Sequence, residues 1–275
     1  GGMYVASKFA LDTLPPFVLL TLRLILAVLA LGAVLGWQGG GAFWRGWPRA
    51  WWRQGLLAGL IGFGLSLGLQ FIGTRLSTAA NGALVTSAAP AFIVLFATLL
   101  LGERLTGARL LAVALATVGV IVVIDPRTAA LGRSGLWGNL ALLGAALTWG
   151  LYSVLIKRAA QTMPVLPLSF IALLGGLALA APAAVVDARA LGIGPITGAV
   201  VWSVLYVGII STAVAMVLWN KSFELLDASL ASLFFFAQPV VGAALGAWLL
   251  NETLGRNFFA GGALIAAGVL IATLR

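Results

Sequence analysis

The sequence predicts an all-α integral membrane protein with ten transmembrane helices, arranged as two inverted-topology repeats of five helices each. Three observations lead to this prediction. The 275 residues are 62% hydrophobic and only 8% charged, whereas a soluble domain carries about 25% charged residues. Apolar runs of about 20 residues, the length that crosses a bilayer as a helix, recur along the whole chain. The second half of the sequence also matches the first half at an offset of 149 residues.

Hydropathy places the predicted spans along the chain with short turns between them. They show no period-2 polar alternation, which argues against an outer-membrane β-barrel. The first span is too short to cross a hydrocarbon core of about 30 Å. The repeat offset aligns Gly1 with Gly150 in the middle of the sixth span, so the first span is expected to be truncated at its N-terminus. The spans are 1–13, 16–36, 54–74, 77–101, 106–125, 135–157, 165–187, 197–220, 227–250 and 255–274.

The internal repeat divides the chain into a first unit at 1–125 and a second unit at 135–275. Because each unit contains five spans, an odd number, the second unit enters the membrane inverted relative to the first. Inverted repeats are typical of secondary transporters, whose substrate site lies near the midplane between the two units. The paired positions include Lys8 with Lys157, Pro15 with Pro164, Gly59 with Gly208, Pro90 with Pro239, and Glu103 with Glu252.

The charged residues exclude several functions and predict an orientation. With no Cys and no His, thiol catalysis, His-based triads and the common zinc sites are excluded. No carboxylate lies in the interior of a predicted span, so a membrane enzyme or an acidic proton relay is poorly supported, and no metal or cofactor is expected. No Walker A sequence occurs, which excludes ATP drive within this chain. Nine of the 16 Lys and Arg fall on one side, which predicts that both termini are cytoplasmic.

Motifs in both units resemble a known transporter repeat. The Trp149-Gly150 pair, Lys157, and an element with Pro90 followed by Gly102-Glu103-Arg104-Leu105 are similar to the EamA repeat of the drug/metabolite transporter superfamily. The resemblance covers the entire chain twice, except that Asn251 stands where the family pattern usually has Gly. Within the superfamily, the sequence most resembles the YddG-type exporters of aromatic amino acids. This resemblance implies ten helices in a bacterial inner membrane, export of amino acids or related metabolites, and a central cavity lined mainly by spans 1, 3, 4, 6, 8 and 9.

Two equivalent helix faces are the first candidates for the substrate cavity. Trp149, Tyr152 and Ser153 share one face of the sixth span, where aromatic rings and a hydroxyl could stack on and hydrogen-bond an amino acid. The alternative is helix packing stabilised by the same side chains. Tyr4 and Ser7 form the corresponding face of the first span.

Two prolines and their neighbours are the second group of candidates. Pro90 and Pro239 lie within the fourth and ninth spans, where a proline removes a backbone hydrogen bond and kinks the helix. Such a kink is either a flexing point of a gate or a static bend. Polar and aromatic side chains that could line the cavity in these two spans are Asn81, Ser87, Ser232, Gln238 and Phe236.

Three cations near or inside the spans complete the candidates. Lys8 and Lys157 end their spans and are possible contacts for a substrate carboxylate, but a lysine there also snorkels to headgroups at little cost. Arg23 lies about 10 Å inside the second span. For Arg23, snorkelling or a carbonyl partner is favoured over recognition of substrate charge.

The sequence therefore predicts a secondary transporter that exports amino acids, aromatic ones included, by alternating access. The nearest alternatives are a transporter of another small metabolite such as a nucleotide sugar, and an exporter of drugs or quaternary cations; a channel is less favoured. The expected partners are a small-molecule substrate and the phospholipid bilayer, with no nucleic acid despite the net charge of +9. The sequence does not predict an oligomeric state, and a monomer is compatible with it.

Overall fold

A computed structural model of the protein describes residues 2–40, 42–102, 106–124, 133–225, 237–251 and 253–273. Within these ranges the regular secondary structure is helical and includes no strand. Two segments have π-helical geometry, η1 (Leu60–Ser66) and η3 (Tyr206–Val214). The α-helices are α1 (Gly2–Leu11), α2 (Pro16–Gly39), α3 (Arg49–Gly59), α4 (Leu67–Leu76), α5 (Ala79–Thr86), α6 (Ala89–Leu101), α7 (Gly107–Ile124), α8 (Arg133–Ala160), α9 (Val165–Leu191), α10 (Gly198–Leu205), α11 (Ala215–Leu225), α13 (Ala237–Leu250) and α14 (Arg256–Thr273).

The described helices overlap the predicted spans, although several extend further, and residues 227–236 of the ninth predicted span lie outside the described residues. The helix of the third span begins at Arg49 rather than at residue 54, and α8 continues to Ala160 through Lys157 and Arg158. Hydropathy detects only the apolar part of a helix, whereas the backbone stays helical through polar turns at the membrane surface. The fourth span is interrupted, because α5 ends at Thr86 and α6 begins at Ala89.

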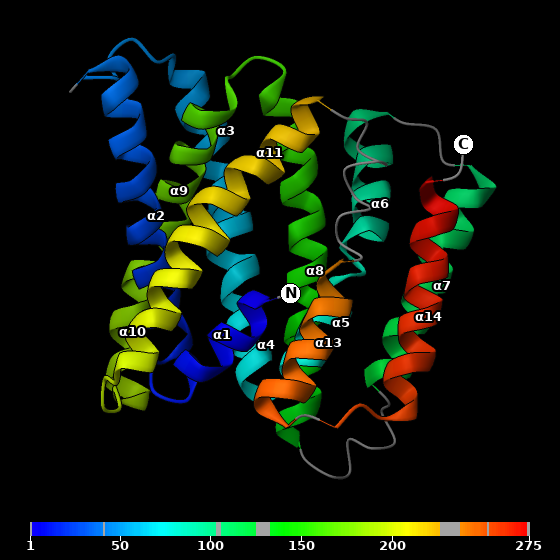
Figure 1. Ribbon diagram of the computed structural model, residues 1–275. Coiled ribbons are helices and arrows are strands. Elements are labelled where there is room, and N and C mark those ends of the chain that lie inside the picture. Colours follow the sequence, from blue (N-terminus) through cyan, green and yellow to red (C-terminus); the bar gives the residue numbers. More distant parts are fainter. Residues whose placement is uncertain are drawn as a thin grey trace.

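The helices run up and down in one bundle, with α8 near its centre (Figure 1). On one side α2 packs against α9, and α9 against α3 and η1. In the middle, α8 contacts α4, α6 and η1, while α7 and α14 pack mainly against each other at the edge of the bundle. Helix α1 starts at mid-height in the bundle and contacts α10, α13 and α4.

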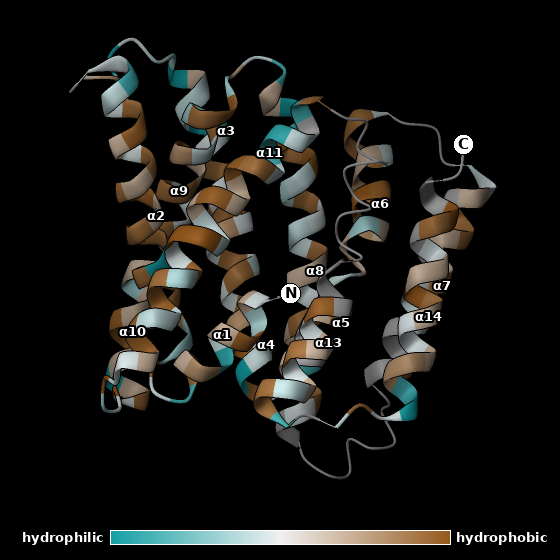
Figure 2. Ribbon diagram, in the orientation of Figure 1, coloured by the Kyte–Doolittle hydropathy of each residue, from teal (hydrophilic) through white to brown (hydrophobic). Residues whose placement is uncertain are grey.

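The outside of the bundle is apolar, as a bilayer requires. Leu29, Trp202 and Phe259 are more than half exposed, and hydrophobic residues dominate the helix middles while hydrophilic ones gather at the ends (Figure 2). Polar backbone groups in lipid must be satisfied internally, which helices achieve. Within the described residues, six helical segments are long and apolar enough to span a membrane: Pro16–Gly39, Arg49–Leu76, Asn81–Leu101, Gly135–Ala160, Val165–Leu191 and Gly198–Ser222. The protein is therefore a multi-pass membrane protein, and the full count of ten spans stays a prediction.

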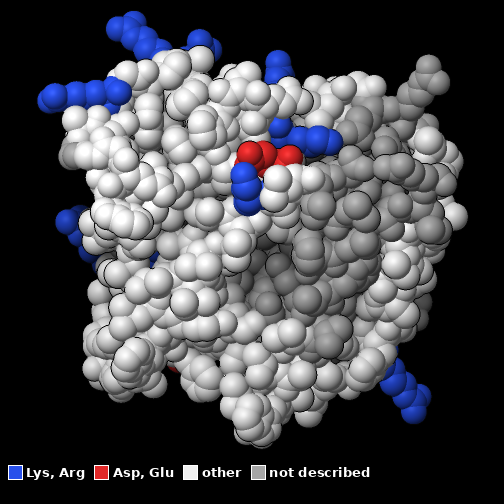
Figure 3. All heavy atoms as spheres, turned by 45° about the horizontal axis from the view of Figure 1, so that its top comes forward, with Lys and Arg blue, Asp and Glu red and all other residues white. Residues whose placement is uncertain are grey.

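Basic residues collect at one end of the bundle. The C-terminal ends of α8 and α11, which carry Lys157, Arg158 and Lys221, lie at the same end as the start of α3 with Arg49 and Arg53. Figure 3 looks toward this end and shows Lys and Arg side chains around its edge. At the opposite end, the Asp187 carboxylate accepts a hydrogen bond of 2.8 Å from Phe17 N in the first turn of α2, where an anion is stabilised by the helix dipole.

Glycines allow α3 and η1 to approach α9 closely. A Cβ added to Gly59 would overlap the backbone carbonyl of Ala172, and one added to Gly175 would overlap backbone atoms of Leu56. Small residues at such contacts are the usual means by which helices pack in lipid, where apolar side chains gain little by leaving the surroundings. This contact fixes α3, η1 and α9 as a unit beside the interior of the bundle.

Replacing Gly59 by Ala is expected to destabilise the protein by about 1–3 kcal/mol, because the added methyl group must displace the α9 backbone. The matched control is Gly36→Ala in α2, where an added Cβ meets no atom within 4 Å. That control should be neutral or stabilising by up to about 1 kcal/mol, since Ala favours the helix. Thermal unfolding of the purified variants in detergent measures both effects. Equal melting temperatures for the two variants would contradict the close contact.

Candidate functional site

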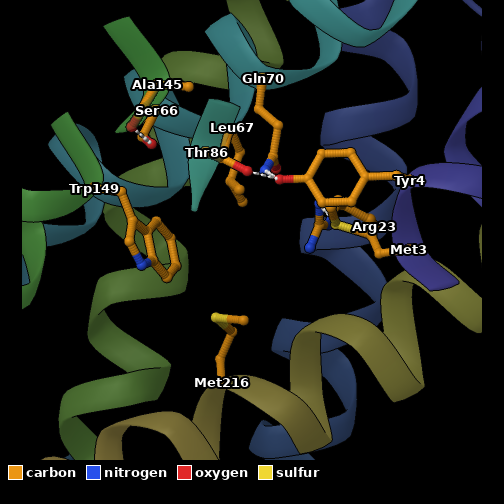
Figure 4. Close-up of a pocket in the computed structure, with 10 residues that line it drawn as sticks. All are labelled: Met3, Tyr4, Arg23, Ser66, Leu67, Gln70, Thr86, Ala145, Trp149 and Met216. Atoms are coloured by element: carbon orange, nitrogen blue, oxygen red, sulfur yellow. Dashed lines mark hydrogen bonds between the residues drawn. The ribbon is translucent and has the colours of Figure 1, made fainter. Parts of the chain in front are cut away.

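A cavity of about 60 Å³ lies in the interior of the bundle, between helices from both halves of the chain. In this conformation it has room for a few water molecules. Arg23 and Trp149 face each other across the cavity, and Met216 closes a third side (Figure 4). The described residues that line it are Met3, Tyr4, Arg23, Ser66, Leu67, Gln70, Thr86, Ala145, Trp149 and Met216.

The two π-helical segments position residues beside this cavity. Ser66 ends η1 and donates to the carbonyl of Ala145 in α8 at 2.8 Å. Thr212 in η3 donates to the carbonyl of Val207, five residues earlier, at 2.6 Å. Shifting η1 by 149 residues places it at 209–215, which overlaps η3. The same shift aligns Leu67 with Met216, and both line the cavity. π-Helical turns are frequent at functional sites because they redirect side chains.

Arg23 is fully buried and directs its guanidinium into the cavity (Figure 4). Its Nε donates to Thr212 Oγ1 at 2.8 Å, its Nη1 donates to Met3 Sδ at 3.4 Å, and the group lies 5.2 Å from the centre of the Phe71 ring. All three partners are neutral. The expectation that Arg23 snorkels or binds a backbone carbonyl is wrong, because the side chain points into the protein and its hydrogen bonds go to a hydroxyl and a sulfur.

A hydrogen-bonded relay that includes Tyr4 lies next to Arg23 (Figure 4). Gln70 Nε2 contacts the Tyr4 hydroxyl, the Tyr4 hydroxyl contacts Thr86 Oγ1, and Thr86 Oγ1 donates to the carbonyl of Gly82 at 2.7 Å. The residues come from α1, α4 and α5. The relay ties the ends of three helices together at the cavity and keeps the Tyr4 ring, which is 1% exposed, in place.

Aromatic rings form the wall that contains Trp149. The Trp149 ring lies 4.8 Å from that of Tyr152 and 6.2 Å from that of Phe63, between centroids. Tyr152 is buried behind Trp149, and its hydroxyl donates to Asn220 Oδ1 at 3.3 Å. The side chain of Asn220 donates in turn to Ser169 Oγ at 2.8 Å. Trp149 therefore contacts the cavity, while Tyr152 supports it from behind and does not line it.

Two of the four polar residues described next, Ser153 and Ser87, satisfy carbonyls of the preceding helical turn. Ser153 Oγ donates to the carbonyl of Trp149 at 2.9 Å, and Ser87 Oγ donates to that of Ala83 at 2.6 Å. Asn81 lies in the first turn of α5, where its backbone N–H donates to Thr78 Oγ1 at 3.0 Å. Ser7 is buried, and its hydroxyl has no partner among the described residues. None of these four is among the lining residues.

The two predicted lysine contacts lie at helix ends. Lys8 Nζ donates to the carbonyls of Thr74, Arg75 and Ser77 at 3.0, 3.2 and 2.9 Å. These carbonyls belong to the C-terminus of α4, the negative end of its dipole. Lys157 lies in the last turn of α8 and is half-buried. Lys8 and Lys157 are not among the lining residues of the cavity in this conformation.

The structure places Pro90 at a helix start. Pro90 lies in the first turn of α6, directly after the interruption at Ser87 and Ala88, where a missing N–H costs no hydrogen bond. Pro239 lies in α13, and the residues before Ala237 lie outside the described residues. The side chains of Pro239 and Gln238 lie outside the described residues, as do Ser232 and Phe236 altogether.

The sequence prediction placed Trp149 and Tyr4 at one site, and the structure brings both to the cavity. It missed Met3, Thr212 and Met216, and gave Arg23 the wrong surroundings. The interior position of Arg23 was the available signal, because an ionisable residue within a span usually faces a cavity or the bundle interior. The methionines carried no comparable signal, since they resemble ordinary packing residues.

An apolar helical bundle around a small, partly polar interior cavity defines this chain as a multi-pass membrane protein, and the family to which its sequence belongs places it in the transporter class. The chain belongs to the EamA-like transporter family, whose sequence profile matches residues 1–125 and again residues 136–274. The family is part of the drug/metabolite transporter superfamily. A solved crystal structure with 24% sequence identity superposes on 98% of this chain and 94% of its own, with a TM-score of 0.68.

Three similar proteins are described as a permease-like protein, a transporter and an exporter. The putative permease-like protein YdzE of Bacillus subtilis is 52% identical over 67 residues, which is 24% of this chain and 86% of that protein. The uncharacterized transporter YoaV of the same organism is 24% identical over 99% of this chain and 92% of its own length. A probable terminal-alkyne amino-acid exporter of Streptantibioticus cattleyicolor is 26% identical over 72% of this chain and 65% of that protein.

Replacing Lys8 by Met is expected to lower stability by about 1–3 kcal/mol, because three carbonyls at the end of α4 lose a charged donor. The matched control is Lys221→Met, which removes an exposed ion pair with Glu224 that is worth about 0–1 kcal/mol. Thermal unfolding in detergent compares the two variants. If Lys8→Met unfolds at the temperature of the control, then the contacts of Lys8 with α4 are not stabilising.

Proposed function

We propose that this protein is a secondary transporter that exports amino acids, aromatic ones included, across the bacterial inner membrane by alternating access. The observation that carries the proposal is the buried cavity, which combines the aromatic ring of Trp149 with the guanidinium of Arg23 and the amide of Gln70. Rings supply apolar contact area, while a few placed polar groups orient a small ligand. The probable amino-acid exporter among the similar proteins supports the same substrate class.

The change of access follows from two inverted repeats, at 1–125 and 135–275. Support comes from the related positions of η1 and η3 and from Leu67 and Met216, which approach one cavity from the two halves. Exchanging the conformations of two such halves opens the cavity first to one side and then to the other. At about 60 Å³ the cavity is far smaller than typical ligand sites of roughly 300–1,000 Å³. In the proposed mechanism, substrate enters when the halves move apart and the cavity widens.

The substrate gradient is the simplest driving force. No carboxylate is among the cavity-lining residues in the part of the chain that the structure describes, and intramembrane Asp and Glu are the usual proton carriers of pumps. Facilitated diffusion or exchange needs no such group. The basic helix ends at one end of the bundle favour an orientation with that end and both termini in the cytoplasm.

A proteoliposome counterflow assay with labelled amino acids and nucleotide sugars tests the proposed function. We expect saturable accumulation of aromatic and other amino acids and none of nucleotide sugars, which carry two phosphates while Arg23 is the one cation among the described lining residues. Accumulation of a nucleotide sugar, or no movement of any amino acid, would overturn the substrate class. Non-saturating electrical current would favour a channel.

Replacing Trp149 by Ala should reduce flux of aromatic amino acids by about tenfold, because it removes the ring that faces the cavity. The matched control is Trp37→Ala, since Trp37 is 88% exposed on the outside of the bundle. Flux is compared at equal amounts of protein inserted in the liposome membrane. The inserted amount is the protein that stays with the membrane when the liposomes are extracted. The role of Trp149 is refuted if both tryptophan variants transport at the rate of the parent.

Replacing Pro90 by Ala should slow turnover by about fivefold and change KM by less than about twofold, because alanine restores an N–H that can bond to Thr86 and join α5 to α6. A continuous helix is stiffer at the point where the fourth span is interrupted. Initial rates at varied substrate concentration separate the two parameters. Unchanged turnover would mean that the interruption is a static bend.

A further inference from the structure

Three buried polar atoms on cavity-lining side chains have no hydrogen-bond partner among the residues that the structure describes: Arg23 Nη2, Gln70 Oε1 and Trp149 Nε1. Leaving a buried polar atom unpaired costs about 1–3 kcal/mol, and more when it is charged. Native proteins therefore leave few of them, and each needs a reason. Two of these three, Arg23 Nη2 and Gln70 Oε1, offer opposite chemistry on the walls of one cavity.

The hydrogen-bonded relay determines which end of the Gln70 amide is left free. The Gly82 carbonyl can only accept, so the proton of the Thr86 hydroxyl is used on it. Tyr4 must then donate its own proton to Thr86, and the Tyr4 oxygen accepts from Gln70 Nε2. This order of donors leaves Gln70 Oε1 as an acceptor without a donor in the described part of the chain.

The surroundings of Arg23 hold a positive charge without neutralising it. Thr212 and Met3 bind two of its nitrogens and Phe71 lies against the group, and all three are neutral. Among the described residues no Asp or Glu forms an ion pair with Arg23. Burying a charge is expensive unless an opposite charge is supplied. A ligand carboxylate is the group that meets a guanidinium with the best geometry and energy.

We propose that Arg23 Nη2 binds the carboxylate of the substrate and Gln70 Oε1 accepts a hydrogen bond from its ammonium group. The cavity thus selects free α-amino acids with both groups unblocked. This inference rests on the proposed function and narrows it. It excludes quaternary cations, which Arg23 repels, and it makes Arg23 the residue that determines specificity for the acid group.

Three probes with the same phenylethyl body separate the two contacts. L-Phenylalanine carries both groups, 3-phenylpropionate only the carboxylate, and phenethylamine only the ammonium. Calorimetric titration of the purified full-length protein in detergent should show the tightest binding for L-phenylalanine. Each single-group probe should bind about tenfold more weakly or worse, since hydrogen bonds to charged groups are the stronger ones.

Two variants should each lose affinity for a different pair of the three probes. Arg23→Gln should weaken L-phenylalanine and 3-phenylpropionate by about tenfold or more and leave phenethylamine unchanged or slightly improved. Gln70→Leu should weaken L-phenylalanine and phenethylamine and leave 3-phenylpropionate unchanged. A misfolded variant would lose all three probes alike, so the crossed pattern separates recognition from folding. Arg189→Gln, at the end of α9 far from the lining residues, is the matched control.

The proposal is overturned if the parent protein binds phenethylamine as tightly as L-phenylalanine, or if Arg23→Gln weakens all three probes equally while it unfolds at the parent's temperature. Its failure is distinct from failure of the proposed function. Counterflow of amino acids that persists with an unchanged KM in Arg23→Gln would retain the transport function and reject the Arg23 contact. Arg23-dependent binding of 3-phenylpropionate without amino-acid counterflow would retain the contact and reject amino-acid export.

Discussion

Hydrogen bonding without water is the constraint on which the rest of this structure depends. A bilayer interior offers no partners, so each polar group must find one inside the protein or remain unpaired at a cost. Ser87 and Ser153 bond to carbonyls of their own helices, Lys8 holds the end of α4, and Tyr4 joins the relay to Gln70. Against this background, the unpaired atoms of Arg23 and Gln70 mark the cavity as the place where a ligand completes the hydrogen bonding.

Close packing and helix irregularity bring these groups together. Gly59 and Gly175 allow α3 and α9 to touch through their backbones, and η1, which continues α3, ends at Ser66 beside α8. A second π-helical turn presents the hydroxyl of Thr212 to Arg23. In a regular α-helix, each side chain points about 100° around the axis from the one before it. The π-segments change that phase, so polar groups meet inside the bundle instead of facing lipid.

The sequence predicts the helices well because a span is recognisable from its own residues. The site is less predictable, because it depends on contacts between distant residues. Arg23 and Thr212 are separated by 189 positions, and Gln70 and Tyr4 by 66. The shared location of Trp149 and Tyr4 could be predicted, because the repeat pairs the helix face that carries Trp149 with the face that carries Tyr4. Hydropathy could not distinguish Ser153, which bonds to its own helix, from a hydroxyl that faces the cavity. The position of Arg23 within a span favours the bundle interior, but hydropathy has the same value for a buried arginine and for a snorkelling one at that depth.

The neutral surroundings of Arg23 also bear on turnover. A transporter must bind its substrate firmly enough to select it and loosely enough to release it on the other side. A resident carboxylate beside Arg23 would compete with every substrate carboxylate, whereas a guanidinium held by Thr212, Met3 and Phe71 stays available. When the halves move apart, water can solvate the guanidinium and weaken its attraction for an anion. In the proposed mechanism, the same conformational change that opens the cavity also loosens the charge contact, which links access to release.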